Sequence, residues 1–132
     1  IYNLTNIYAV EYDIANYEIQ LFMNAADVVI SPRINTLNSG VVFMGFSFGK
    51  VVIGADSGNV GEILKNTGNP VFNPHDVASI AAAMEEAYRL SKTDLGSINL
   101  EYVRTECDIN LLGKKYIELY KSLCMAYSSR TL

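Results

Sequence analysis

Short apolar runs, many of them β-branched, alternate with longer amphipathic segments through the first half of the chain. The apolar runs predict four strands, at residues 7–10, 28–30, 50–54 and 70–72. The segments between them predict helices, at residues 15–25, 38–48 and 60–65. Strands without polar–apolar alternation suit a sheet buried on both faces, and helical connections imply right-handed crossovers between parallel strands. We therefore expect an α/β fold, a Rossmann-like three-layer αβα arrangement with a short parallel sheet.

The C-terminal third of the chain has helical periodicity throughout. Three helices are predicted there, at residues 77–90, 94–106 and 110–127. Asp76 is expected to cap the first of them. The last carries an apolar stripe of Leu112, Tyr116, Leu119 and Leu123. The earlier helix at residues 38–48 is apolar on every side, which predicts burial, and Gly45 in its middle indicates close packing against a neighbouring helix or a ligand.

Composition and charge limit the function classes. The 132 residues, 50% of them hydrophobic, are expected to form a single domain over residues 1–132. The formal charge of −4 is not offset by a Lys/Arg cluster, which argues against a nucleic-acid partner. No apolar stretch reaches the roughly 20 residues that span a bilayer, and no signal-peptide pattern opens the chain. We therefore expect a soluble, cytoplasmic protein, and the first residue, Ile1 rather than Met, indicates a piece of a longer one.

Few side chains offer covalent or metal chemistry. The two cysteines lie in no redox or metal-binding pattern, and reduced, buried thiols are expected for Cys107 and Cys124. His75 is the only histidine and stands in a predicted turn, so neither a Ser/His/Asp triad nor a His-based metal site is supported. We expect no metal and no cofactor, and the sequence identifies no catalytic residue.

Two polar loops are expected at the carboxyl ends of the strands, the edge at which open parallel sheets bind ligands. The first, at residues 35–40, leads into the helix at residues 38–48 and contains Thr36, Asn38, Ser39 and Gly40. Unpaired amides and the helix dipole favour a phosphate there, unless Asn38 or Ser39 serves only as an N-cap. The second loop, at residues 56–62, is either another anion nest or a tight turn with Glu62 in the first helical turn.

Four segments, in this order, resemble signatures of retaining-type glycosyltransferases with the GT-B fold. Residues 24–32 are similar to "aaADvfvlPS", residues 44–53 to "EAmacGkPVv" and residues 56–63 to "d.GGipEiv". Residues 73–87 are similar to "pp.D...la.Ai...l". The chain thus resembles the C-terminal, nucleotide-sugar-binding domain of a group 1 / family 4 type enzyme. The resemblance implies a partial GT-B C-terminal domain, truncated at its N-terminal side, with a helical C-terminal third.

The resemblance also implies an activity. The chain would belong to a glycosyltransferase of the hexosyltransferase type, which transfers a sugar to a glycan or lipid-linked acceptor in polysaccharide biosynthesis. The resemblance places the donor diphosphate, without a metal, at Thr36, Asn38, Ser39 and Gly40. It places the donor base or ribose near Tyr12, Gly45 and Glu62. An N-terminal domain of the same full-length chain would hold the acceptor, so this part alone would be inactive. Peripheral membrane association of the full-length protein is compatible with that role.

The chain departs from the family at two acidic positions. The family carries two glutamates eight positions apart, where Leu37 and Gly45 stand here, and the second glutamate normally binds the ribose. Some bacterial members resemble this chain in having a Thr/Asn-Ser-Gly type loop at the first position, so we expect a variant donor site at residues 37–40. The alternatives are a non-catalytic GT-B-like partner domain, a sugar-nucleotide 2-epimerase, and a receiver-like or generic nucleotide-binding domain.

Overall fold

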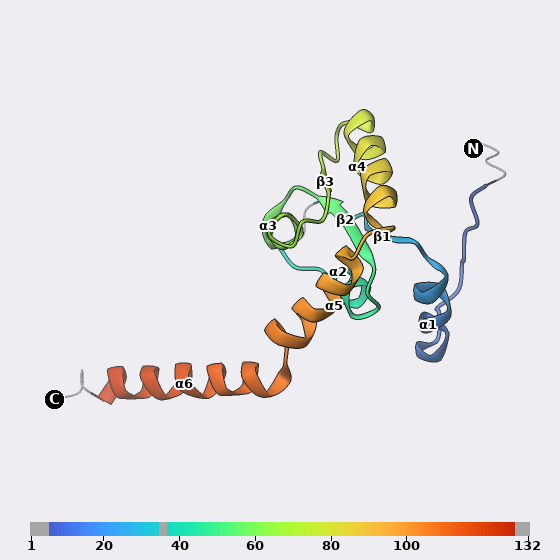
Figure 1. Ribbon diagram of the computed structural model, residues 1–132. Helices are drawn as coiled ribbons and strands as arrows, with labels where there is room; N and C mark the ends of the chain where they lie inside the picture. Colours follow the sequence, from blue (N-terminus) through green and yellow to red (C-terminus); the bar gives the residue numbers. More distant parts are fainter. Residues whose placement is uncertain (1–5, 35–36, 129–132) are drawn as a thin grey trace.

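The computed structural model describes residues 6–34 and 37–128, arranged as in Figure 1. Its elements are, in chain order, α1 (Asn16–Ala25), β1 (Val28–Ser31), α2 (Gly40–Ser47), β2 (Val51–Ala55), α3 (Gly58–Asn66), β3 (Val71–Phe72), α4 (Val77–Leu90), α5 (Leu95–Glu106) and α6 (Ile109–Ser128). All of the predicted helices are present, with small shifts at their ends. Three of the predicted strands are present as well.

The three strands form one parallel sheet in the order β1-β2-β3. β1 pairs with β2 from Val28 against Val51 onward, whereas the short β3 joins only the carboxyl end of β2, with Val71 against Gly54. Each strand lies beside the one before it, so right-handed crossovers place α2 and α3 on the same face of the sheet. The predicted α/β fold with a short parallel sheet is confirmed.

Side chains of the central strand β2 alternate between two cores, one on each face of the sheet. The first core joins the sheet to α2 and α3 and contains Val29, Val42, Phe46, Val52, Val60 and Leu64. The second joins the sheet to α4 and the start of α5 and contains Val51, Ile53, Ala55, Phe72, Ala83, Ala87 and Leu95. Every residue of β2 is buried, as the unbroken apolar run predicts. The sheet is therefore the middle layer of three.

α2 lies between the sheet and α5. Its Phe46 ring meets the Tyr102 ring of α5 edge to face, with centroids 6.1 Å apart. On the sheet side, a β carbon added at Gly45 would lie 2.5 Å from Cγ2 of Val52 and 3.4 Å from Cβ of Val29. A glycine is therefore required at position 45 because the helix approaches the sheet closely. The sequence predicted close packing against a helix or a ligand, and the structure shows that the neighbour is the sheet.

Two buried asparagines close the amino end of the sheet. Asn69 and Asn99 exchange side-chain hydrogen bonds of 2.7 and 3.0 Å. Asn69 Oδ1 also accepts from the backbone N–H of Val52 at 3.0 Å, on the side of β2 that the short β3 does not reach. Asn99 Nδ2 donates to the carbonyl of Lys50 at 2.9 Å. This pair satisfies backbone groups that would otherwise be buried without a partner.

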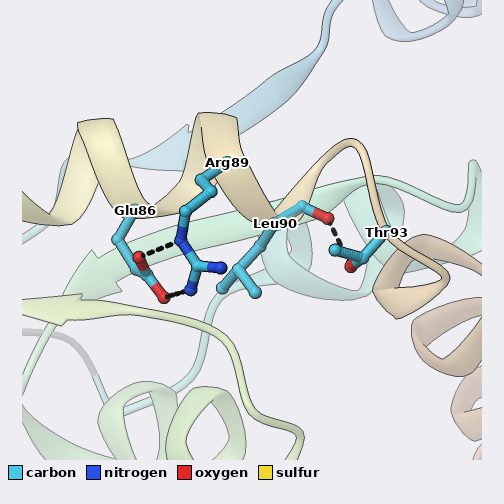
Figure 2. A network of polar contacts seen from close by, with 4 residues as sticks. All are labelled: Glu86, Arg89, Leu90 and Thr93. Atoms are coloured by element: carbon cyan, nitrogen blue, oxygen red, sulfur yellow. Dashed lines mark hydrogen bonds and ion pairs between the residues drawn. The ribbon is translucent and has the colours of Figure 1, made fainter.

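α4 begins and ends with local side-chain hydrogen bonds. The Asp76 carboxylate accepts from the N–H of Ala78 at 2.9 Å, so the predicted N-cap is confirmed. At the other end, Figure 2 shows the Arg89 guanidinium across the Glu86 carboxylate and the Thr93 hydroxyl on the Leu90 carbonyl, the latter at 2.7 Å. The hydrogen bond from Arg89 lowers the pKa of the exposed Glu86 carboxyl.

The strand predicted at residues 7–10 is wrong. These residues form no strand, and the side chains of Ile7 and Tyr8 are 63% and 92% exposed. A four-residue apolar run shows no periodicity of its own, and it becomes a strand only where a neighbouring strand supplies hydrogen-bond partners. Here the segment runs outside the sheet as extended chain that leads into α1 (Figure 1).

The first and last helices extend from the three layers (Figure 1). α1 has no buried residue, although Met23 packs against the first core. Every described side chain of α6 is exposed. The expected burial of both thiols is therefore wrong for Cys124 on α6, whereas Cys107, just before that helix, is half-buried. Over the described ranges, no helix combines the length and the apolarity needed to cross a membrane.

Candidate functional site

The carboxyl ends of β1 and β2 bring the two candidate loops to the same edge of the sheet. α2 begins at Gly40 after the first loop, and α3 begins at Gly58 after the second. Because the strands are parallel and adjacent, both helices start at this edge. The edge therefore presents two helix N-termini side by side, each with backbone N–H groups that lack intrahelical partners.

Two serines fix the start of α2 against β1. Ser31 is the last residue of β1, Ser39 precedes α2, and their hydroxyl oxygens lie 3.1 Å apart within hydrogen-bonding distance. Both are buried, with exposures of 1% and 7%. Ser39 occupies the N-cap position, but its hydroxyl makes no hydrogen bond to the described backbone of α2. The side-chain cap offered as the alternative for Ser39 is therefore not formed, and the hydroxyl orients the helix instead.

Gly40 opens the first turn of α2. It is exposed, and apart from its chain neighbours and the backbone of its own helix, no atom of the described residues lies within 4 Å of where its β carbon would be. The first hydrogen bond of the helix is the one from Val42 N–H to the Ser39 carbonyl, at 3.3 Å. The amides of Gly40 and Val41 precede that bond, at the positive end of the helix dipole. Among the described residues, the first turn of α2 is therefore open on the side of Gly40 where a side chain would stand.

Hydrogen bonds join the two loops. Asn38 Oδ1 accepts from the side chain of Asn59 at 2.7 Å, and the Leu37 carbonyl accepts from the backbone N–H of Asn59 at 3.2 Å. Asn59 lies in the first turn of α3. The predicted diphosphate-binding residue Asn38 is thus partly engaged by the second loop. The two loops are therefore joined to each other at this edge of the sheet.

The second loop is packed against itself. Gly58 starts α3 with a left-handed φ of +55°, and the Asp56 carboxylate pairs with Lys65 at 2.7 Å. A β carbon at Gly61 would lie 2.9 Å from Asp56 Oδ1 and 3.0 Å from its backbone. These contacts support the tight-turn interpretation over an anion nest. Glu62 is exposed and follows the first turn of α3, so its expected position inside that turn is wrong.

The remaining predicted site residues are Thr36, Tyr12 and Gly45. Thr36 lies outside the described residues. Tyr12 is 61% exposed in the extended segment before α1, because the strand expected to position it does not form. Gly45 is buried against the sheet and offers no surface to a ligand at the start of α2. Of the predicted donor-binding set, the structure brings together Asn38, Ser39 and Gly40.

Sequence reasoning missed Ser31. Ser31 directly follows the strand predicted at residues 28–30, and it was assigned no role. The available signal was a hydroxyl at the carboxyl end of a buried strand, eight residues before a second hydroxyl at a predicted helix start. Adjacent loops at one sheet edge make such pairs reachable, but the register that joins them is tertiary information.

The opposite edge of the sheet holds a polar cavity of about 270 Å³ between the amino ends of β1 and β2 and the start of α5. Lys92 pairs with Asp27 there at 2.8 Å, and this hydrogen bond lowers the pKa of Asp27 and raises that of Lys92. Lys50 Nζ donates to the carbonyl of Asn24 at 3.2 Å. These groups hold α1 and α4 to the sheet, and we interpret the cavity as a structural junction.

In the described part of the chain, no group of three or more His, Cys, Asp or Glu side chains could hold a metal ion.

Comparison with known proteins adds no relative. No family model matches the chain, and no curated protein or solved structure matches it either.

Proposed function

We propose that the start of α2 holds the diphosphate of a nucleoside-diphosphate sugar, and that the chain is the donor-binding part of a glycosyltransferase. The observation that carries the proposal is the open first turn at Gly40, at the carboxyl edge of a parallel sheet. A helix N-terminus carries about half a unit of positive charge together with unpaired N–H donors. Both features suit a pyrophosphate group.

The residues around this turn would act in different ways. The amides of Gly40 and Val41 would donate to phosphate oxygens as negative charge develops on the leaving diphosphate. Ser39 would act as a positioning group, because its buried hydroxyl lies against Ser31 and fixes where the helix begins. Asn38, which accepts a hydrogen bond from Asn59, would hold the second loop beside the first. The sequence resemblance supplies the sugar-nucleotide class and a cytoplasmic location, with the acceptor on a separate domain.

One feature supports a second candidate, a non-catalytic partner domain with the same fold. The positions of both family glutamates are apolar here. Leu37 is 74% exposed, but its side chain cannot accept a hydrogen bond from a ribose hydroxyl. Gly45 is buried against the sheet. The ribose contact would therefore have to come from other groups. The other predicted ribose or base residues, Tyr12 before α1 and Glu62 on α3, are exposed and lie on other elements than α2. A partner domain would keep the fold without binding a donor.

Backbone amide shifts of the ¹⁵N-labelled chain separate the two candidates. UDP, ADP, GDP and inorganic pyrophosphate would each be titrated, with the corresponding nucleosides as controls. The proposal predicts saturable shifts at Gly40 and Val41 with all diphosphates and with pyrophosphate, and none with the nucleosides. The start of α3 at Gly58 is the internal control, because it is also a helix N-terminus but is closed by its own tight turn.

The possible results point in different directions. Shifts confined to α2 support donor binding, and their dependence on the base identifies the nucleotide. Equal shifts at Gly40 and Gly58 would mean nonspecific attraction of anions to helix ends, which contradicts the proposal. If no amide signal shifts at millimolar diphosphate, the result favours the non-catalytic partner domain.

A further inference from the structure

The last helix, α6, has an unpartnered apolar side that the sheet-edge site does not use. Every described side chain of this helix is exposed, and Figure 1 shows it extending away from the sheet and its covering helices. The exposed apolar residues include Ile109, Leu112, Tyr116, Ile117, Leu119, Tyr120 and Leu123. A helix with this much exposed apolar surface is marginal in water unless that surface is covered.

The residues of α6 are sorted into two halves. At about 100° per residue, the large apolar residues above share one half of the helix surface. The opposite half carries Lys114, Lys115, Glu118 and Lys121, interrupted by Leu111 and Met125. Glu118 lies near the middle of the polar half. The lysines flank it, with Lys114 and Lys121 toward one boundary and Lys115 toward the other.

This placement of charge is the one that suits a membrane surface. Lysines at the polar–apolar boundary can bury their methylene stems while the ammonium groups reach the lipid headgroups. Tyrosine rings such as Tyr116 and Tyr120 suit the same depth, apolar at one end and hydrogen-bonding at the other. The acidic Glu118 lies farthest from the apolar half and so farthest from the lipid.

Net charge is segregated in the same direction. Three lysines and one glutamate give α6 a formal charge of +2, which leaves −6 for the rest of a chain whose total is −4. A helix of this length extends about 30 Å, several Debye lengths at physiological salt. The acidic remainder of the chain therefore repels an anionic surface only weakly at the far end of α6.

A second copy of the chain fits the pattern less well. A coiled-coil seam needs apolar residues at two positions of each heptad, flanked by charged residues that set partner and orientation. On α6 the positions beside the seam that begins at Ile109 include Gly113 and Tyr120, and the apolar surface continues to Ile117. A half-apolar cylinder without flanking charge pairs lacks the features that specify a dimer.

We propose that α6 is a membrane-surface helix that lies in the headgroup region of an anionic bilayer, apolar half inward. The proposal is independent of donor binding, because it rests on a different element and its test uses no nucleotide. It predicts that the full chain binds vesicles of phosphatidylcholine with phosphatidylserine about 30-fold more tightly than vesicles of phosphatidylcholine alone, from the net charge of +2 on α6.

Sedimentation with vesicles measures this directly. The double variant Leu119→Glu/Leu123→Glu should lose binding to both kinds of vesicle. Its circular dichroism spectrum in the absence of vesicles should show that the chain is still folded. The triple variant Lys114→Gln/Lys115→Gln/Lys121→Gln should lose only the preference for phosphatidylserine. Met84→Glu is the control, because it adds a carboxylate at a half-exposed apolar residue of α4, outside α6, and should change nothing.

A fluorescence reporter provides a second readout that does not depend on sedimentation. The chain contains no tryptophan, so Leu119→Trp introduces a single probe on the apolar half. Its emission should shift to shorter wavelength with anionic vesicles. The proposal is overturned if the probe does not shift and the chain stays in the supernatant. It is equally overturned if the chain dimerises through α6, with Leu119→Glu abolishing the dimer, and binds no lipid.

Discussion

Gly45 gives the sharpest test of how α2 meets the sheet. Replacement by alanine adds one methyl group on the buried side of the helix, where Cγ2 of Val52 would lie only 2.5 Å away. Ordinary carbon–carbon contacts are about 3.5–4.0 Å, so helix and strand must separate by roughly 1 Å or Val52 must leave its rotamer. Val52 is fully buried, with an exposure of 0%, and its side chain is part of the first core.

The magnitude is a balance of two effects. Overpacking a close-packed core costs about 1–3 kcal/mol, whereas replacing a glycine in a helix by alanine gains at most about 1 kcal/mol. We expect Gly45→Ala to lower the free energy of unfolding by about 1–2 kcal/mol. The matched control is Gly40→Ala in the same helix, where the added carbon meets no described atom within 4 Å outside its chain neighbours and its own helix backbone, and the change should be neutral or stabilising.

Urea unfolding of a double-mutant cycle isolates the clash. Val52→Ala alone should cost about 2–3 kcal/mol because it removes two buried methyl groups. In the double variant the nearest remaining contact to the new methyl is Cβ of Val29 at 3.4 Å, so Gly45→Ala should then cost little. A coupling of about 1 kcal/mol or more is expected. Additive effects would mean that α2 does not press on Val52, and the packing argument would be refuted.

Three further measurements probe other contacts. Asn99→Ala should destabilise the chain by about 2–3 kcal/mol in urea unfolding, because it removes both buried hydrogen bonds to Asn69 and the one to the Lys50 carbonyl; a change within error would contradict this. Lys92→Met should raise the pKa of the Asp27 carboxyl toward its ordinary value in an NMR titration, because it removes the main cause of the lowered pKa. In the native chain the ion pair stabilises the fold above the ordinary pKa of 3.8, and this contribution disappears as the pH falls through the lowered pKa. Cys107 should react with a thiol reagent near pH 8 more slowly than the exposed cysteine on α6, since burial raises its pKa; equal rates would contradict that.

Local signals in the sequence were sufficient for the helices and most of the sheet. Asp76 caps α4 as predicted because capping needs only a carboxylate and the next turn of backbone. The buried run around Val52 predicted a central strand because covering both faces of a strand leaves no polar position. The run at residues 7–10 had the same local character, yet no neighbour pairs with it, and pairing is not a local property.

The candidate site was predictable only in part, for the same reason. The rule that parallel sheets bind ligands at their carboxyl edge located the loop before α2. The hydrogen bond between Ser31 and Ser39 and the closure of the second loop by Asp56 depend on how the elements pack. The same holds for Asn69, which substitutes for a missing strand neighbour of Val52. Residue types indicated which side chains can donate or accept hydrogen bonds, but not which residues they pair with in the fold.

The central claim, that the first turn of α2 binds a diphosphate, is tested most directly by charge at Gly40. Gly40→Glu places a carboxylate at a helix N-terminus, which stabilises the helix by about 0.3–1 kcal/mol but repels an anion bound there. Gly40→Gln has the same shape without the charge. In calorimetric titrations with UDP, ADP and GDP, we predict that the glutamine variant binds like the native chain. The glutamate variant should bind at least about tenfold more weakly, while unfolding at an equal or higher temperature. Equal affinities for the two variants, or binding by neither of them nor by the native chain, would contradict the account.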